Sequence, residues 1–275
     1  MEKLPMILNK KGSLEYYTFE SFDKIDFIGH CFTTRHGGVS TEHLSSLNLG
    51  FSRGDRRENV DKNFDIICSA MGVKKEDCVT LRQVHSTRII TADESIKGMG
   101  FRNDMERIEA DGFVTDKRGI VLVTFHADCV PLYFVDTENR AIGMAHAGWR
   151  GTADGMAEEM VKRMGKEFGT KPENIKAAVG PSIGQCCFQV DVPVVEIFRE
   201  KYDFADRFII KDESAEGKYK IDLWGINRQL LINNGVAAEN IEIGGICTKC
   251  RPDTFYSHRV MGEKRGTMGA FLFLK

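Results

Sequence analysis

The chain has 275 residues, a formal net charge of −2 and 28% charged residues, which are ordinary values for a soluble globular protein. The near-neutral balance without a basic block argues against a nucleic-acid partner, and no apolar run is long enough to predict a membrane span. The first twenty residues lack the apolar core of a secretory signal, so we expect a cytoplasmic protein with its 8 cysteines reduced. A chain of this length can bury a core without disulfides, and we expect one domain over residues 1–275.

The apolar patterns, taken in chain order, predict both strands and helices. Apolar, β-rich runs predict strands at 26–34, 78–84, 120–126, 131–136, 141–147, 175–179 and 268–274. Apolar residues at helical spacing predict helices at 57–71, about 153–168, 191–202 and 222–234, and the charged stretch 211–220 is predicted to be a loop. Because strands and helices mix without strict alternation, we predict the α+β class: a single layered domain with mixed β-sheets and flanking helices.

Two of these strands, 131–136 and 141–147, are separated by a short polar turn that is typical of a β-hairpin. In the simplest register Pro131 lies opposite His146, and Cys129 is then a diagonal neighbour of His146. Such cross-strand neighbours are roughly 5–8 Å apart. The register therefore places a thiol and an imidazole within reach of one shared ion, or of each other.

The segment 148–152 (GWRGT) follows this hairpin and precedes a predicted helix, with Thr152 as a candidate N-cap. Its glycines would let a ligand approach the backbone, and the free N–H groups of the helix start together with Arg150 would suit a phosphate. An ordinary strand-to-helix turn with a surface arginine fits the same residues equally well.

Two further residues near the ends of strands are open to more than one interpretation. His85 follows the predicted strand 78–84, where a lone histidine is more often structural, and its spacing does not bring it close to Cys129. Asp128 precedes Cys129 and is either a carboxylate that moves protons near the site or the cap of a turn.

Eight motifs, taken together and in order along most of the chain, resemble the signatures of the YfiH-like family of bacterial proteins. That family carries both the name polyphenol oxidoreductase (laccase) and the name purine nucleoside phosphorylase. The motifs are TRHGGVS (34–40), LRQVHS (81–86), EADGFVT (109–115), HADCVPL (126–132), HAGWRGT (146–152), GPSIGQCCFQV (180–190), DLWGINRQL (222–230) and FYSHR (255–259).

The resemblance implies a metal site formed by His85, Cys129 and His146 within a single α+β domain. It also implies phosphorolysis of adenosine, inosine, guanosine and methylthioadenosine, and deamination of adenosine, so the expected partners are a purine nucleoside and phosphate. Two imidazoles and one thiolate suit Zn²⁺ and leave a fourth position open, which is the catalytic pattern. Cys129 and Asp128 are the candidate catalytic residues, and Arg150 and Arg35 are the candidate substrate and phosphate ligands.

Copper would also bind such a site, because affinity for nitrogen and sulfur ligands rises toward Cu²⁺. A multicopper oxidase, however, needs several histidines, usually as paired H-x-H motifs, and the 7 histidines here contain no such pair. We therefore expect any polyphenol oxidase activity to be incidental.

Two other functions remain open at this stage. In a cysteine hydrolase, Cys129 would be the nucleophile and His146 the base, and His85 would not be needed. In a non-enzymatic module that binds a metal ion and interacts with a partner, the same three residues would hold the ion but would catalyse no reaction. The C-x-x-C pair Cys247 and Cys250 is predicted to be structural thiols. The vicinal pair Cys186 and Cys187 either lines the pocket or is buried in packing, and burial is the default.

Overall fold

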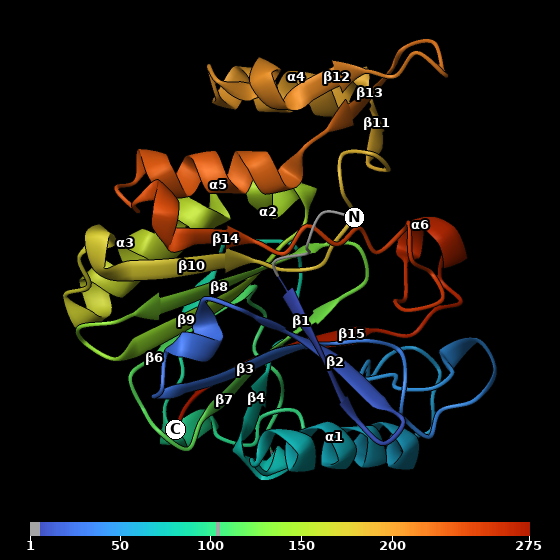
Figure 1. Ribbon diagram of the computed structural model, residues 1–275, viewed down its shortest axis with the longest axis vertical. Coiled ribbons are helices and arrows are strands. Elements are labelled where there is room, and N and C mark those ends of the chain that lie inside the picture. Colours follow the sequence, from blue (N-terminus) through green and yellow to red (C-terminus); the bar gives the residue numbers. More distant parts are fainter. Residues whose placement is uncertain (1–5, 103–104) are drawn as a thin grey trace.

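The computed structural model describes residues 6–102 and 105–275, so residues 1–5 and 103–104 of the predicted domain lie outside the described part. Within the described part, the chain forms three β-sheets and six α-helices (Figure 1). Two sheets combine parallel with antiparallel pairs, so the predicted mixture of helices and mixed sheets is confirmed. None of the described helices is long and apolar enough to span a membrane.

The first six-stranded sheet contains both ends of the described chain. All its pairs are antiparallel except the β4–β7 pair. Its order is β1 (Met6–Lys11), β2 (Leu14–Phe19), β3 (Ile28–Thr33), β15 (Met268–Leu274), β7 (Val121–His126) and β4 (Cys78–Thr80). Helix α1 (Arg57–Met71) packs its apolar side chains Val60, Phe64 and Ile67 with strand residues of this sheet.

The second six-stranded sheet contains the predicted hairpin at its centre. Its outer pairs β14–β10 and β6–β5 are parallel, and the inner pairs are antiparallel. Its order is β14 (Ile241–Ile243), β10 (Ile175–Val179), β8 (Val130–Asp136), β9 (Ala141–Ala147), β6 (Gly112–Thr115) and β5 (Ile89–Thr91). Helices α3 (Met156–Phe168) and α5 (Leu223–Asn233) share a core cluster with residues of this sheet.

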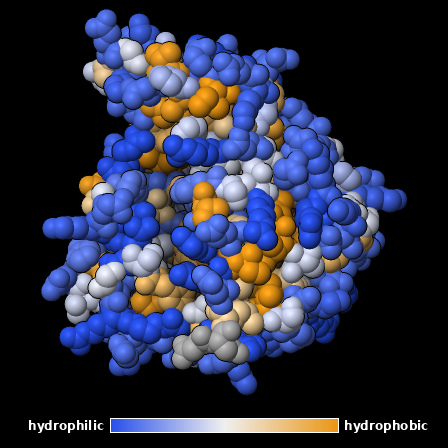
Figure 2. Space-filling view, turned by 180° about the vertical axis from the view of Figure 1, so that it is seen from behind, coloured by the Kyte–Doolittle hydropathy of each residue, from blue (hydrophilic) through white to orange (hydrophobic). Residues whose placement is uncertain are grey.

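A third, small sheet has the antiparallel order β11 (Gln189–Asp191), β13 (Lys218–Ile221) and β12 (Ile209–Lys211). With α4 (Val192–Lys201) it forms the part at the top of Figure 1. The opposite face of the molecule is mostly polar, with apolar residues gathered near its centre and beneath this upper part (Figure 2). The short helices α2 (Trp149–Ala153) and α6 (His258–Met261) complete the set within the described residues.

Several predicted elements match closely, and others need correction. Strands β9, β10 and β15 and helix α1 have the predicted bounds. The predicted helix 153–168 is α3 and begins at Met156, because Gly155 adopts a left-handed φ of 81° after the separate helix α2 ends at Ala153. Helix α2 begins earlier than expected, with Gly148 as its N-cap, so Thr152 lies inside it. The stretch 211–220 is no simple loop, because it includes the end of β12 and most of β13.

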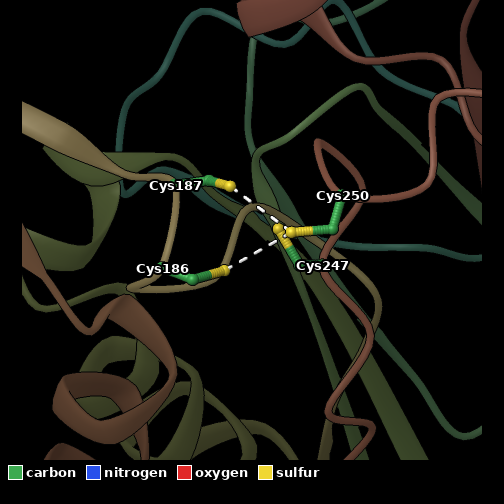
Figure 3. A group of neighbouring side chains, drawn as sticks. All are labelled: Cys186, Cys187, Cys247 and Cys250. Atoms are coloured by element: carbon green, nitrogen blue, oxygen red, sulfur yellow. Dashed lines mark hydrogen bonds between the residues drawn. The ribbon is translucent and has the colours of Figure 1, made fainter.

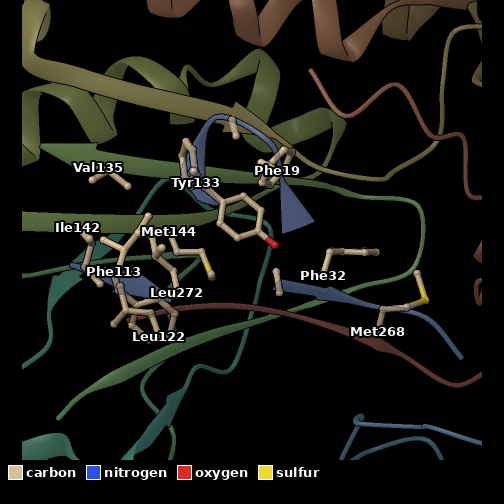
Figure 4. Packing of buried hydrophobic residues seen from close by; sticks show 14 of the residues in the cluster. Phe19, Phe32, Phe113, Leu122, Tyr133, Val135, Ile142, Met144, Met268 and Leu272 are labelled. Carbon is tan, nitrogen blue, oxygen red and sulfur yellow. The ribbon is translucent and has the colours of Figure 1, made fainter. Parts of the chain in front are cut away.

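A buried tyrosine links the two large sheets. Tyr133 on β8 is fully buried, and its hydroxyl donates a 2.9 Å hydrogen bond to the backbone carbonyl of Cys31 on β3. Figure 4 shows its ring among apolar side chains from both sheets, including Phe32 and Met144. This bond satisfies a hydroxyl that would otherwise be buried without a partner.

We expect Tyr133→Phe to lower the free energy of unfolding by about 1–2 kcal/mol, since it removes one partner of a buried hydrogen bond. Denaturant titration measures the change. The half-buried Tyr219 on β13 provides a control, and Tyr219→Phe is expected to change stability by less than about 0.5 kcal/mol. Equal midpoints for both variants would show that the inter-sheet bond contributes nothing.

Candidate metal centre

The hairpin of β8 and β9 has the predicted register. Pro131 pairs with His146, and Val130 pairs with Ala147. Cys129 directly precedes β8, after a turn in which Asp128 adopts a left-handed φ of 83°. The turn and the register together bring the Cys129 thiol beside the His146 ring.

His85 reaches the same place by a route that its position in the sequence does not reveal. Strand β4 ends at Thr80, earlier than predicted, and the following loop carries His85 in a left-handed conformation with φ 61°. The backbone amides of Val84, His85 and Ser86 donate to the carboxylate of Asp111 over 3.2, 3.1 and 2.7 Å. Such a conformation is costly for a residue with a side chain and persists where surrounding contacts enforce it.

Asp111 also orients the second histidine. Its Oδ1 accepts a 2.9 Å hydrogen bond from Nδ1 of His146, and its backbone oxygen accepts a 2.7 Å bond from the His146 amide. With Nδ1 engaged, Nε2 is the nitrogen of His146 that remains for a metal ion. A carboxylate behind a ligand histidine is the usual arrangement in protein metal sites.

The structure therefore brings His85, Cys129 and His146 together. Their ligand atoms all lie within 4.8 Å of one another, and the two imidazole rings are 4.9 Å apart between centroids. Gly148 passes close beside them: a Cβ there would lie 2.8 Å from His85 Nδ1 and 3.1 Å from Cys129 Sγ. The glycine is thus required for the close approach of the backbone to these side chains.

The charges in this group depend on one another. Burial lowers the pKa of His85, and the neighbouring His146 lowers it further, which favours a neutral imidazole. Burial by itself would lower the pKa of His146, but Cys129 and Asp111 raise that pKa to about 9. Burial opposes ionisation of Asp111, yet hydrogen bonds from His146 and Ser86 bring its pKa below the ordinary value. Asp111 is therefore held as a carboxylate.

His126, the histidine nearest to this group in the sequence, has both ring nitrogens occupied. Nδ1 is 3.0 Å from the backbone oxygen of Cys129, and Nε2 is 2.8 Å from the hydroxyl of Thr124. Burial lowers its pKa well below the ordinary value, which favours the neutral ring. It therefore supports the backbone at Cys129 and has no free nitrogen for a ligand.

Two adjoining cavities of about 350 and 430 Å³ open beside the three side chains. They share His85, Cys129, Arg53 and Arg265, and these volumes lie in the range of small-molecule sites. Arginines line both cavities: Arg53, Arg82, Arg107 and Arg265 in the first, and Arg53, Arg150, Arg259 and Arg265 in the second. Arg53 forms an ion pair with Glu263, which also lines the second cavity, and Arg82 forms one with Glu109. The other arginines suit an anionic ligand such as phosphate.

Asp128 lies at the second cavity, but its carboxylate is engaged by protein groups. It accepts hydrogen bonds from Thr248 Oγ1 at 2.6 Å, Ser257 Oγ at 3.0 Å and the Arg259 amide at 2.7 Å. These bonds tie the turn before Cys129 to distant parts of the chain. The geometry supports the turn-holding interpretation of Asp128 over that of a proton carrier.

The two candidate anion ligands are placed differently. Arg150 lines the second cavity, and its guanidinium lies 4.3 Å from the centroid of the Trp149 ring. Arg35 does not lie among the described residues that line either cavity. Its guanidinium donates to the carbonyls of Ser45 and Pro252 and lies over the ring of Tyr256. The structure therefore does not bring Arg35 to this centre.

Sequence reasoning missed Asp111 and most of the cavity arginines. Asp111 lies in the motif EADGFVT, so the motif was visible, but nothing in its spacing shows which side chains the carboxylate contacts. Arg53 and Arg265 lie in charged loop segments that look like ordinary solvated surface. Arg265 shortly precedes β15, which pairs with β7, and the loop that carries Arg53 follows Asn48 and Leu49, which are hydrogen-bonded to Thr267.

The prediction that the vicinal pair Cys186 and Cys187 is buried is wrong. Cys186 and Cys250 are exposed, and Cys187 and Cys247 are half-buried. The four sulfur atoms lie within 4.8 Å of one another, so the described residues contain a second group that could hold a metal ion.

Comparisons with known proteins show the family of this chain. The family model described as multi-copper polyphenol oxidoreductase laccase matches residues 29–275. The chain belongs to this family. Purine nucleoside phosphorylase YlmD of Bacillus subtilis (strain 168) is 36% identical over 245 residues, which cover 89% of this chain and 87% of that protein. Adenosine deaminase RL5 from an unknown prokaryotic organism is 34% identical over 251 residues, covering 89% and 95%.

A solved structure extends the similarity to the whole fold. The crystal structure of the Bacillus licheniformis hypothetical protein YfiH superposes with a TM-score of 0.91 at 34% identity, covering 99% of this chain and 100% of the other. The resemblance to YfiH-like proteins seen in the sequence motifs is therefore confirmed.

We predict that Asp111→Asn lowers zinc affinity about 10–100-fold. The asparagine side chain has only one oxygen, so it cannot accept hydrogen bonds from all of the backbone amides and the His146 ring that now face the two carboxylate oxygens. The measurement is zinc retained per chain against a competing chelator. Asp136→Asn is a matched control: Asp136 is equally buried and caps the turn of the same hairpin through the Glu138 and Asn139 amides. It is expected to reduce stability without changing zinc affinity, and equal zinc affinity in both variants would contradict the role of Asp111.

Proposed function

We propose that this chain is a zinc-dependent purine nucleoside phosphorylase that acts on adenosine, inosine, guanosine and methylthioadenosine, and that it also deaminates adenosine. The observation that carries the proposal is the group of His85, Cys129 and His146 opening onto cavities lined with arginines. The names of the relatives support both activities, since one is a purine nucleoside phosphorylase and another an adenosine deaminase.

The donor set fits zinc. Two imidazoles and one thiolate are common zinc ligands, and three protein ligands leave a position for substrate or water. The bound ion would supply Lewis-acid chemistry next to the cavities. The same donors would also accept copper, but two histidines and one cysteine cannot build a multicopper cluster, so we assign zinc as the working metal.

The arginines supply the phosphate site. In phosphorolysis an oxygen of phosphate bonds to the ribose C1′ as the bond from C1′ to the purine nitrogen breaks, and the departing purine gains a proton. Arg150 lines one cavity, while Arg53 and Arg265 line both, so an anion can be held beside the three-ligand group. Guanidinium groups bind phosphate oxygens in bidentate fashion, which fixes the direction of attack as well as the charge.

The pair of cavities suits a substrate that reacts at either end. Phosphorolysis takes place at the ribose, whereas deamination replaces the amino group at C6 of the purine by a water oxygen and releases ammonia. The cavities meet at His85 and Cys129, so base and sugar can occupy different cavities around one centre.

We place this chemistry in the cytoplasm, where the reducing environment suits eight free thiols.

The purified protein incubated with adenosine is expected to release adenine and ribose-1-phosphate when phosphate is present, and inosine whether or not phosphate is present. Chromatography of the products separates these reactions. His85→Ala is expected to lose zinc from this centre and both activities, because the remaining two ligands bind an ion weakly.

The same variant distinguishes the cysteine hydrolase, whose dyad of Cys129 and His146 does not include His85. Protein purified without chelators that holds no zinc at this centre, and yet reacts stoichiometrically with an alkylating agent at Cys129, would contradict the zinc assignment. Absence of all three products from zinc-replete protein would contradict the purine assignment and leave a metal-binding module.

For Arg150 we predict that substitution by alanine raises the phosphate concentration needed for half-maximal phosphorolysis by about 10-fold or more, since a charge-assisted contact is worth about 1.5–3 kcal/mol. Zinc content should stay unchanged. The half-buried Arg228 on α5 lies outside both cavities, and Arg228→Ala serves as the control for a lost arginine charge. If Arg150→Ala loses bound zinc to the same extent as it loses its response to phosphate, Arg150 has a structural role.

A further inference from the structure

A second cluster of potential metal ligands lies outside the centre described above. It contains Cys186, Cys187, Cys247 and Cys250, whose sulfur atoms lie within 4.8 Å of one another. Figure 3 shows the four side chains pointing toward a common point, with dashed lines from Cys186 and Cys187 to Cys250. We propose that this four-cysteine cluster is a structural zinc site that fastens the loops beside the catalytic cavities.

The topology explains why these residues meet. Strands β10 and β14 are parallel neighbours, and Val179 and Ile243, their last residues, lie side by side. Both strands therefore end at the same edge of the sheet, and the loops that follow leave it together. One loop carries the vicinal pair Cys186 and Cys187, and the other carries the C-x-x-C pair.

Backbone contacts hold the two loops in register up to the cysteines. Ser182 forms a parallel bridge with Cys247, its amide donates to the Ile246 carbonyl, and its own carbonyl accepts from the Thr248 amide. The Gly184 amide donates a 3.3 Å hydrogen bond to the sulfur of Cys247. Amide hydrogen bonds to sulfur orient and stabilise a thiolate, which is the form that binds metal.

The distances fit a single ion. Cys250 Sγ lies 3.7 Å from Cys186 Sγ and 3.4 Å from Cys187 Sγ. Zinc–sulfur bonds of about 2.3 Å in a tetrahedron require sulfur atoms about 3.8 Å apart, so small adjustments complete the site. An iron–sulfur cluster distributes its thiolates over several irons and would hold the sulfurs further apart than one ion does. A bonded disulfide would need about 2.05 Å between two of them.

Four protein ligands close the coordination sphere, so this zinc would be structural and not catalytic. Its effect reaches the catalytic centre through Asp128. Thr248, next to Cys247, donates to the Asp128 carboxylate at 2.6 Å, and the Ile183 amide donates to the Asp128 carbonyl at 2.9 Å. Each of the two loops therefore holds the turn that precedes Cys129.

The first test is metal content by elemental analysis of protein purified without chelators. We expect two zinc ions per chain in the wild type, one in Cys247→Ser/Cys250→Ser and one in Cys129→Ser. Cys68→Ser is the matched control, because Cys68 is a buried thiol in another core cluster, and it should keep two. One zinc in the wild type with no loss in the double variant would overturn the proposal, as would iron in place of zinc.

The second test needs no variant and does not depend on the catalytic activity. Cys186 and Cys250 are exposed, so as free thiols both are accessible to iodoacetamide, although burial and the neighbouring Cys247 raise the pKa of Cys186 and make it the slower of the two to react. Zinc should protect both in native protein, and treatment with a strong chelator should raise their labelling at least 10-fold as read by peptide mass spectrometry. Rapid labelling before chelation, or a peptide pair joined by a disulfide, would overturn the assignment. Because these readouts do not use nucleosides, failure of the proposed enzyme function would leave them unchanged.

Discussion

The interaction on which the candidate centre depends is the set of hydrogen bonds around the buried carboxylate of Asp111. A buried carboxylate is stable where donors surround it, and here the amides of Val84, His85 and Ser86 and the ring of His146 provide them. The same bonds hold His85 in a left-handed conformation and direct the free nitrogen of His146 toward Cys129. One carboxylate thus has its charge stabilised by these donors and brings together His85 from a loop and His146 from β9.

Asp128 acts in a comparable way on the third ligand. Its carboxylate links the turn before Cys129 to Thr248, Ser257 and the Arg259 amide. The position of Cys129 therefore depends on loops that follow β14, and those loops hold two of the clustered cysteines. Both carboxylates are thus engaged by protein donors and position the metal ligands, while arginines are prominent among the side chains that line the cavities.

The sequence predicted the elements that follow from local apolar patterns, and it predicted the contact between Cys129 and His146 that follows from one hairpin. Two continuous apolar runs and the short polar turn between them determine the register of β8 and β9, and with it the approach of Cys129 to His146. His85 could not be placed in this way, because its position follows from a loop wrapped around Asp111 and not from the continuation of β4. The cysteine cluster was missed for a related reason: Cys186 and Cys247 are adjacent only because β10 and β14 pair in parallel across a long intervening segment. The later start of the predicted helix 153–168, at Met156, depends on the backbone of Gly155, whose left-handed φ is not dictated by the helical spacing of its neighbours.

The group of His85, Cys129 and His146 and the four-cysteine cluster differ in the number of ligands that the protein supplies, and this difference determines their roles. Zinc prefers four ligands, so a group that supplies three leaves a position that only water or substrate can fill, and this position is useful where it faces a cavity. His85, Cys129 and His146 line such a cavity, among arginines that attract anions. The four-cysteine cluster supplies a full set from two loops, and a fully coordinated ion has nothing to offer a substrate. Its contribution is to reduce the freedom of those loops, which also hold Asp128. Zinc would therefore take part in the reaction at His85, Cys129 and His146, and it would join two loops at the four-cysteine cluster.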